Sequence, residues 1–274
     1  MNIIDCKEIK NSILEELKSK LDSLPKLKLV VFEIGNDPAS SIYVKNKQKM
    51  CEELGIDFDL KKYDSISEED LINEINICNN DKSVTGILVQ LPLPKELNEK
   101  RVIESIDYKK DVDGLTSTNV GNLTLGNPSL VPCTALGIMK ILKYKNIDIE
   151  GKNVVLVGRS PLVGLPLIPL FLKENATVTV CHSKTSNLKD VTNKADILVV
   201  AIGKKEFITD EYIKENSVVI DVGINRDNNK IYGDCNFDSI KDKVKYITPV
   251  PGGVGVMTVT MLINNLIEAY FLQN

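Results

Sequence analysis

A lysine stands within the apolar face of a predicted helix near the start of the chain. In the segment SSIYVKNKQKMCEELG, Tyr43, Lys47, Met50 and Leu54 recur at the spacing of a single helical face. Such a lysine is usually one whose stem packs while its amine reaches water. The alternative is that the amine does chemistry, because burial lowers the proton affinity of a lysine and lets it act near neutral pH.

Other polar residues are predicted to lie near this lysine. The run GILVQLPLP places Gln90 inside an otherwise hydrophobic strand, and KDVDGLT places Asp111 and Asp113 at a turn that begins a long loop. Ligands of open parallel sheets bind beyond the carboxyl ends of the strands. We therefore expect Tyr43 to offer a flat face, Lys47 an amine, Gln90 an amide and Asp113 a carboxylate to one cleft.

A third segment could let a flat ligand approach the main chain. In TPVPGGVGVMT, Pro249, Pro251 and two adjacent glycines give the backbone a stiff path that is largely free of side chains. A tight turn before the last helix is the simpler interpretation, and composition alone favours it.

The second half of the chain contains a possible nucleotide turn. In NVVLVGRSPLVGLPL a hydrophobic strand leads into Gly158, a tight turn, Gly164 and a helix. In a dinucleotide-binding turn of this kind, backbone N–H groups and the positive end of the helix receive a pyrophosphate. The glycine spacing is G-x5-G and differs from G-x-G-x-x-G, so an ordinary strand-to-helix turn remains an alternative.

The residues after the next strand favour NADP over NAD. Enzymes that use NAD commonly carry Asp or Glu at this point to hold the ribose 2′-hydroxyl. Here TVTVCHSKTSNL supplies His182, Ser183, Lys184 and Thr185, while Arg159 projects from the first turn. Two cations and two hydroxyls suit a 2′-phosphate. The alternative is that Arg159 and Lys184 are solvated loop charges.

Short β-branched runs alternate with amphipathic stretches, which predicts a parallel α/β fold. A polar, Gly- and Asn-rich segment suggests a domain junction near residues 115–132. Helices are expected over residues 39–54, 68–80, 134–144 and 257–272, and strands in KLKLVVFEIG, VTGILVQL, NVVLVG, TVTVC, DILVVAIG, SVVIDVG and KYITPV.

Composition narrows the classes of function. The 274 residues carry a formal net charge of −4, which gives no general attraction for nucleic acid or an anionic membrane. No apolar run is expected to approach the ~20 residues that span a bilayer, and the N-terminus lacks a signal-peptide core, so a cytoplasmic location is predicted. The six cysteines are scattered and His182 is the single histidine, so no metal site is expected.

Together these segments resemble the bifunctional methylenetetrahydrofolate dehydrogenase/cyclohydrolase family. The resemblance covers almost the whole chain in family order. It rests on YVKNK, GILVQLPLP, KDVDGLTSTNVGNL, PCTALGI, GKNVVLVGRSPLVGLP, VTVCHSKT, ADILVVAIGK, VVIDVGIN and YITPVPGGVGVMT.

The resemblance implies a cytoplasmic homodimer with two α/β domains that face each other across a cleft, the second one Rossmann-like, linked by long helices. A folate-binding catalytic domain would span residues 1–118, completed by a C-terminal helix at 256–274, and an NADP-binding domain would span 119–255. The implied activity is NADP-dependent oxidation of 5,10-methylenetetrahydrofolate to the 5,10-methenyl form, followed by hydrolysis to 10-formyltetrahydrofolate.

The resemblance also implies roles for single residues on the folate side. Tyr43 would pack against the folate rings, Lys47 would be the principal catalytic group, Gln90 would position it, and Asp113 would hydrogen-bond the pterin. The predicted folate-lining loop is Pro251, Gly252, Gly253 and Val254.

On the cofactor side the resemblance implies the following contacts. The phosphate turn would comprise Gly158, Arg159, Ser160 and the nearby Gly164. Ser183 would contact the 2′-phosphate, and Ile224 would lie on the nicotinamide side.

Two positions depart from the family pattern. Val256 replaces a proline in PGGVGPMT, and Ala135 replaces a proline in PCTP. Both changes affect the starts of helices and no proposed catalytic side chain.

Two other functions remain open from the sequence. One is a dehydrogenase without the hydrolytic step, and the other is a non-catalytic nucleotide-binding regulator. Lys47, Gln90 and Asp113 argue against the regulator, which would have no need of that polar set.

Overall fold

The computed structural model describes residues 3–228 and 230–274 and divides into two compact units. One unit contains Ile13–Cys133 and Val259–Asn274, and the other contains Thr134–Thr258 with the N-terminal residues up to Ser12. The division falls inside helices α1 (Cys6–Leu21), α6 (Cys133–Tyr144) and α10 (Val254–Gln273), so each of these helices contributes residues to both units.

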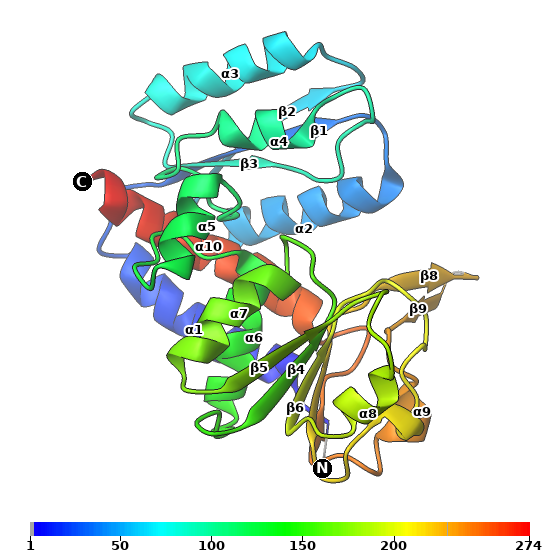
Figure 1. Cartoon of the computed structure of the whole chain (residues 1–274). Helices are drawn as coiled ribbons and strands as arrows, with labels where there is room; N and C mark the ends of the chain where they lie inside the picture. The colour runs from blue at the N-terminus through cyan, green and yellow to red at the C-terminus, as the bar shows by residue number, and fades with distance from the viewer. Residues whose placement is uncertain (1–2, 229) are drawn as a thin grey trace. The chain divides into compact units, whose positions relative to one another are not determined.

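The unit that contains Lys47 is built on a parallel sheet with strand order β2-β1-β3. Val30, Phe32 and Ile34 alternate along β1 and pack against α3 and α4, while α2 covers the opposite face (Figure 1). The elements are β1 (Lys28–Ile34), α2 (Pro38–Glu53), β2 (Asp57–Tyr63), α3 (Glu68–Asn80), β3 (Gly86–Val89), α4 (Glu99–Glu104) and α5 (Ser117–Thr124).

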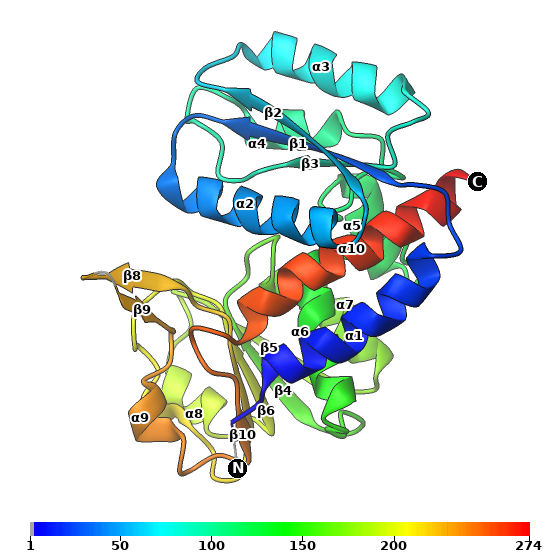
Figure 2. The same ribbon diagram turned by 180° about the vertical axis from the view of Figure 1, so that it is seen from behind.

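The other unit contains a parallel sheet with strand order β10-β7-β6-β4-β5. Helices α8 and α9 lie on one face and α7 lies on the other (Figure 2). A two-stranded antiparallel hairpin, β8–β9, follows β7. The elements are β4 (Asn153–Val157), α7 (Gly164–Lys173), β5 (Thr177–Cys181), α8 (Leu188–Thr192), β6 (Ile197–Val200), β7 (Val218–Asp221), β8 (Asn225–Asp227), β9 (Lys230–Tyr232), α9 (Phe237–Ile240) and β10 (Tyr246–Ile247), with a 3-10 turn at Asp210–Tyr212.

The predicted α/β fold with parallel sheets is confirmed. The predicted helix at 68–80 matches α3, and those at 39–54 and 134–144 match α2 and α6 to within a residue. The sequence pattern missed β2, the hairpin β8–β9 and α5, which lies inside the polar segment taken for a junction. These elements are short or rich in polar residues, so they lack a strong hydrophobic period.

Helix α10 corrects one expectation. The sequence was expected to contain no apolar run close to the length of a membrane span. This 20-residue helix, with a mean hydropathy of 1.3, is long and apolar enough to cross a membrane by length and composition alone. Much of it is buried within the protein, including Met261, Leu266 and Ile267, as in a core helix of a folded domain.

Candidate functional site

Helix α2 presents Tyr43 and Lys47 one turn apart. The carboxylate of Asp37 caps the helix by accepting the backbone N–H of Ser40 at 2.8 Å, and Pro38 occupies its first turn. The helix therefore starts directly after the carboxyl end of β1. Tyr43 is half-buried and Lys47 is buried on the face that covers the sheet.

The amine of Lys47 is held inside the protein by Gln90. Lys47 is only 8% exposed, and its Nζ donates to Gln90 Oε1 at 2.7 Å. Gln90 directly follows β3, where its backbone N–H donates to the carbonyl of Phe32 at 2.9 Å and its Nε2 donates to the carbonyl of Leu91 at 2.7 Å. The amide oxygen is thus fixed toward the lysine. The interpretation of Lys47 as a side chain that reaches out to water is wrong.

Burial changes the protonation of this amine. Loss of hydration lowers the pKa of Lys47 from its ordinary value of 10.5, while the negative charge of Asp113 acts in the opposite direction. Gln90 can accept a hydrogen bond from either the charged or the neutral amine. The site therefore suits a lysine that exchanges a proton at lower pH than a surface lysine.

The turn that carries Asp113 is organised by a buried carboxylate. Asp111 is 1% exposed and accepts the backbone N–H groups of Gly114 at 3.0 Å and Thr116 at 2.7 Å. It also accepts Asn119 Nδ2 at 2.9 Å. Burial raises the pKa of Asp111, and the hydrogen bonds from Thr116 and Asn119 partly oppose that effect. Asp111 thus shapes the turn, while the half-buried Asp113 remains available to a ligand.

Sequence reasoning missed two residues that brace this turn from behind. Asn265 on α10 donates through Nδ2 to the carbonyls of Val112 at 2.9 Å and Val131 at 2.8 Å. The thiol of Cys133 also donates to the carbonyl of Val112, at 3.3 Å. Burial raises the pKa of Cys133 well above its ordinary value, so the thiol stays neutral. The sequence signal for Asn265 was the pair of asparagines inside a largely apolar helix.

In the other unit, close backbone packing explains the glycine spacing of the β4–α7 turn. Gly158 has φ of +124°, and a Cβ there would lie 2.2 Å from the carbonyl oxygen of Ala201. A Cβ on Gly164 would lie 2.2 Å from the carbonyl oxygen of Gly158. The two glycines therefore allow the start of α7 to sit directly against the end of β4.

The start of α7 suits an anion. Among the described residues no side chain caps this helix, whose N-cap position is Val163. Its first N–H groups and positive dipole end can receive phosphate oxygens. Arg159 is exposed and Ser160 is half-buried within the same turn. The predicted phosphate turn is thus open on the side where the helix begins.

The end of β5 lies beside that turn. Val157 pairs with Cys181, and the N–H of Gly158 donates to the carbonyl of Cys181 at 2.9 Å. His182 serves the local turn, because its Nδ1 accepts the N–H of Lys184 at 3.1 Å. Ser183 and Lys184 remain exposed at the sheet edge that also carries Arg159.

The remaining predicted residues follow β7 and β10. Ile224 is 42% exposed, and a Cβ on Gly255 would lie 3.4 Å from its Cδ1. In the predicted folate loop, Pro251 is exposed and Gly252 is half-buried with φ of +94°, while Gly253 and Val254 are buried. This loop and Ile224 belong to one unit, whereas the set of Tyr43, Lys47, Gln90 and Asp113 belongs to the other.

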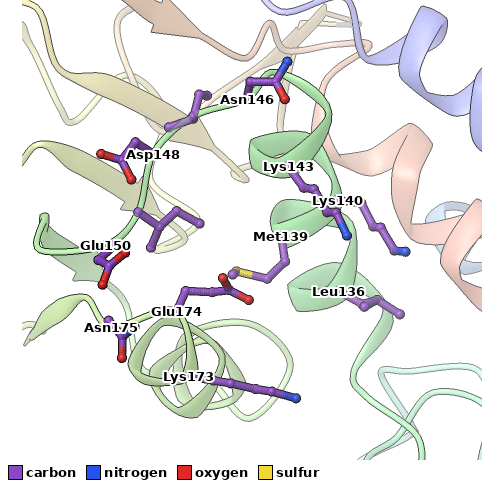
Figure 3. Close-up of a pocket in the computed structure, with 12 residues that line it drawn as sticks. Leu136, Met139, Lys140, Lys143, Asn146, Asp148, Glu150, Lys173, Glu174 and Asn175 are labelled. Atoms are coloured by element: carbon purple, nitrogen blue, oxygen red, sulfur yellow. The ribbon is translucent and has the colours of Figure 1, made fainter.

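A separate surface pocket of about 470 Å³ lies between α6 and the end of α7 (Figure 3). Lys140 and Lys143 stand on its α6 side, opposite Asp148 and Glu150. It contains none of the predicted site residues. Within residues 3–228 and 230–274, no cluster of three or more His, Cys, Asp or Glu side chains could hold a metal ion.

Comparisons with known proteins agree over the whole chain. The tetrahydrofolate dehydrogenase/cyclohydrolase catalytic domain matches residues 4–113, and the NAD(P)-binding domain of the same family matches residues 132–274. The chain is 52% identical to "Bifunctional protein FolD" of Agathobacter rectalis, with 98% of each chain covered.

Two solved structures extend this similarity to the fold. The bifunctional methylenetetrahydrofolate dehydrogenase/cyclohydrolase of Campylobacter jejuni has a TM-score of 0.96 and 44% identity, with 99% of each chain covered. The Trypanosoma brucei dehydrogenase-cyclohydrolase, solved in complex with NADP and an inhibitor, has a TM-score of 0.94 and 34% identity, with 99% of this chain and 97% of that chain covered.

The brace behind Asp113 can be tested with neighbouring asparagines. Asn265→Leu removes the donor to two backbone carbonyls and should lower the free energy of unfolding by about 1–3 kcal/mol. Asn264→Leu is the control, because Asn264 is half-buried on the same helix and makes no side-chain hydrogen bond among the described residues. Urea denaturation of both variants measures the difference, and equal losses would show that the brace adds nothing.

The effect on stability of the close contact at Gly158 can be distinguished from the effect of its positive φ. Gly158→Ala should cost more stability than Gly151→Ala, because Gly151 also has a positive φ of +70° but has no atom within 4 Å of an added Cβ. Thermal unfolding of the two variants gives the comparison. Similar melting temperatures would mean that the β4–α7 turn shifts without cost to accept a side chain.

Proposed function

The chain belongs to the tetrahydrofolate dehydrogenase/cyclohydrolase family, and on that premise we propose that it carries out both reactions. It oxidises 5,10-methylenetetrahydrofolate to the 5,10-methenyl form with NADP, and it hydrolyses that product to 10-formyltetrahydrofolate. The observation that carries the proposal is the buried amine of Lys47, hydrogen-bonded to Gln90 at 2.7 Å in a Tyr-x-x-x-Lys helix.

The oxidation requires alignment of two flat molecules more than it requires acid or base. NADP, when bound, supplies the acceptor for the hydride that leaves the one-carbon unit. The chain's part is to hold the pyrophosphate at Gly158–Ser160 and the start of α7, and to hold the 2′-phosphate with Arg159 and Ser183. The residues fit, because β5 ends without a carboxylate and these side chains are accessible at one sheet edge.

The hydrolysis makes direct use of Lys47. Water adds to the cationic methenyl carbon and loses a proton, which a neutral amine at Lys47 accepts. The proton then passes to the ring nitrogen as its bond to that carbon breaks, and the hydroxyl group of the adduct releases its own proton to solvent as it becomes the carbonyl of the 10-formyl group. A charged lysine would repel the cationic substrate, so the lowered pKa of Lys47 serves this step. Gln90 fixes the direction of the amine.

Asp113 and Tyr43 complete the folate side of the proposal. The carboxylate of Asp113 would accept hydrogen bonds from the pterin, on a turn that Asp111 and Asn119 hold rigid. Tyr43 would pack its ring against the substrate. Pro251, Gly252, Gly253 and Val254 as folate contacts, and Ile224 as a nicotinamide contact, remain predictions.

The remaining proposals concern the whole protein. We propose a cytoplasmic homodimer that acts on tetrahydrofolate derivatives, without nucleic acid or membrane partners. The division into a folate-binding domain at 1–118 with 256–274 and an NADP-binding domain at 119–255 also remains a proposal.

The activity is tested with purified protein and 5,10-methylenetetrahydrofolate, run separately with NADP and with NAD. We expect reduced NADP and 10-formyl product, with slower reduction of NAD. Accumulation of the methenyl compound with no hydrolysis above the uncatalysed rate would reduce the proposal to a dehydrogenase. Failure to reduce either nucleotide would contradict it.

Lys47→Met should abolish hydrolysis of the methenyl compound, because the amine that accepts the proton is lost. Lys45→Met is the control, since Lys45 is exposed on the same helix, and its hydrolysis rate should stay within about twofold of the wild-type rate. Retention of hydrolysis by Lys47→Met would contradict the proposed role.

The Lys47→Met variant should also be more stable than the wild type. Because the pKa of Lys47 is lowered in the folded state, protonation of its amine penalises folding below that pKa, and the penalty disappears as pH rises toward 10.5. The gain in melting temperature should therefore be a few degrees at neutral pH and should vanish at high pH. Melting curves across pH measure it, and a variant less stable than the wild type at neutral pH would contradict a desolvated amine.

A further inference from the structure

Two buried carboxylates lie outside the site described above, in the unit that carries the nucleotide turn. Asp221 ends strand β7 and is 3% exposed, and Asp234 follows β9 and is 0% exposed. Among the described residues, neither forms a salt bridge with the side chain of a lysine, arginine or histidine. Each carboxylate is instead surrounded by hydrogen-bond donors of loops that leave the carboxyl end of the sheet.

Asp234 holds the loop that follows β6. It accepts three successive backbone N–H groups, from Ile202 at 2.7 Å, Gly203 at 3.0 Å and Lys204 at 2.8 Å. Gly203 has φ of +63°, which helps turn these groups toward one point. Consecutive N–H groups in this arrangement form a concavity that commonly binds an anion. Here the anion is a side chain of the protein itself.

The same carboxylate joins that loop to the one after β7. Asp234 Oδ1 also accepts Asn225 Nδ2 at 2.9 Å, and Asn225 directly follows Ile224. A Cβ on Gly223 would lie 2.2 Å from the Asp234 carboxyl carbon, so only glycine allows this approach. Asp234 thus fixes two neighbouring loops at once.

Asp221 in turn holds the backbone of Asp234 and of the loop after β7. It accepts the backbone N–H groups of Gly223 at 3.0 Å, Asp234 at 3.0 Å and Cys235 at 2.9 Å. A Cβ on Gly233 would lie 1.9 Å from Asp221 Oδ2. Burial raises the pKa of Asp221 to about 6, while these backbone donors act in the opposite direction. Burial of the Asp221 carboxylate therefore has a cost in stability, which its backbone donors offset in part.

We propose that Asp234, supported by Asp221, is a positioning residue for the cofactor, which fixes the loops after β6 and β7 at the nicotinamide end of bound NADP. The inference rests on the proposed function. Ligands of doubly wound sheets bind outside the carboxyl ends of the strands, which is where both loops lie, and Ile224 is exposed on one of them. A loop displaced by about 1 Å would misplace the cofactor.

Asp234→Asn tests the proposal, because it keeps the shape of the side chain but replaces one acceptor oxygen with an NH2 group. Calorimetric titration should show NADP binding weakened by about 10-fold to 100-fold, with a parallel rise in the KM for NADP. Hydrolysis of added 5,10-methenyltetrahydrofolate needs no oxidation of substrate and should remain within about twofold of wild type.

Asp196→Asn is the matched control. Asp196 accepts the backbone N–H of Asn153 at 2.9 Å and Lys214 Nζ at 2.5 Å, but it lies at the opposite, amino end of β6. This variant should lose stability without a change in NADP affinity. Equal NADP affinity of Asp234→Asn and wild type would overturn the proposal, and so would an equal loss of both activities.

A milder variant covers the case in which Asp234→Asn does not fold. Asn225→Ala removes the link to Asp234, together with the bonds of the same amide to the carbonyls of Gly233 at 3.2 Å and Tyr232 at 3.5 Å, and leaves the three backbone donors to Asp234 in place. It should weaken NADP binding by about 3-fold to 10-fold, and an unchanged affinity would overturn the proposal.

The titration also separates this inference from the proposed function. If the wild type binds NADP but does not turn over folate, the proposed function fails while the comparison of affinities still decides the role of Asp234. If the wild type does not bind NADP, both fail.

Discussion

Removal of the Lys47 amine from water is the constraint on which the catalytic half of the protein depends. A buried lysine is unfavourable when charged, so the fold must supply a partner that tolerates either protonation state. Gln90 is such a partner, because its amide is neutral and its oxygen is fixed by hydrogen bonds at the end of β3. A carboxylate in the same place would pair with the charged amine and keep it protonated.

Buried carboxylates with backbone partners recur in both units. Asp111 gathers N–H groups around the turn that presents Asp113, and Asp221 and Asp234 gather N–H groups around the loops after β6 and β7. A carboxylate accepts several donors at once, so one residue can fix a loop that has no regular secondary structure. In each case the organising residue is buried, and a more accessible neighbour, Asp113 or Ile224, is the one proposed to contact a ligand. The energetic cost of these charges is thus linked to the geometry of the sites.

The sequence predicted the main helices and the buried strands well, because their hydrophobic patterns are local. The apolar period of α3 and the β-branched runs of β4, β6 and β7 are visible within a short window. The edge strand β2 and helix α5 were missed because their side chains are largely polar and their pairing depends on distant residues.

In the candidate site too, the sequence revealed residues with a local signal and missed those that depend on tertiary contacts. Lys47 was conspicuous as a charge in an apolar stripe, and Gln90 as an amide in a strand. Asn265 lies 152 positions away from Asp113 in the numbering, and its contact with Val112 follows only from the tertiary fold. The direction of the pKa of Lys47 also required the structure, because the stripe fitted both a side chain that reaches water and a buried amine.

The most direct measurement is the pKa of Lys47 itself, obtained by NMR titration of protein labelled with ¹³C at the lysine side chains and assigned with Lys47→Met. The structure predicts one lysine resonance that titrates below the ordinary value of 10.5 and disappears in the variant. A Lys47 that titrates at or above 10.5 would contradict the account, because its amine would then be a permanent cation beside a cationic substrate.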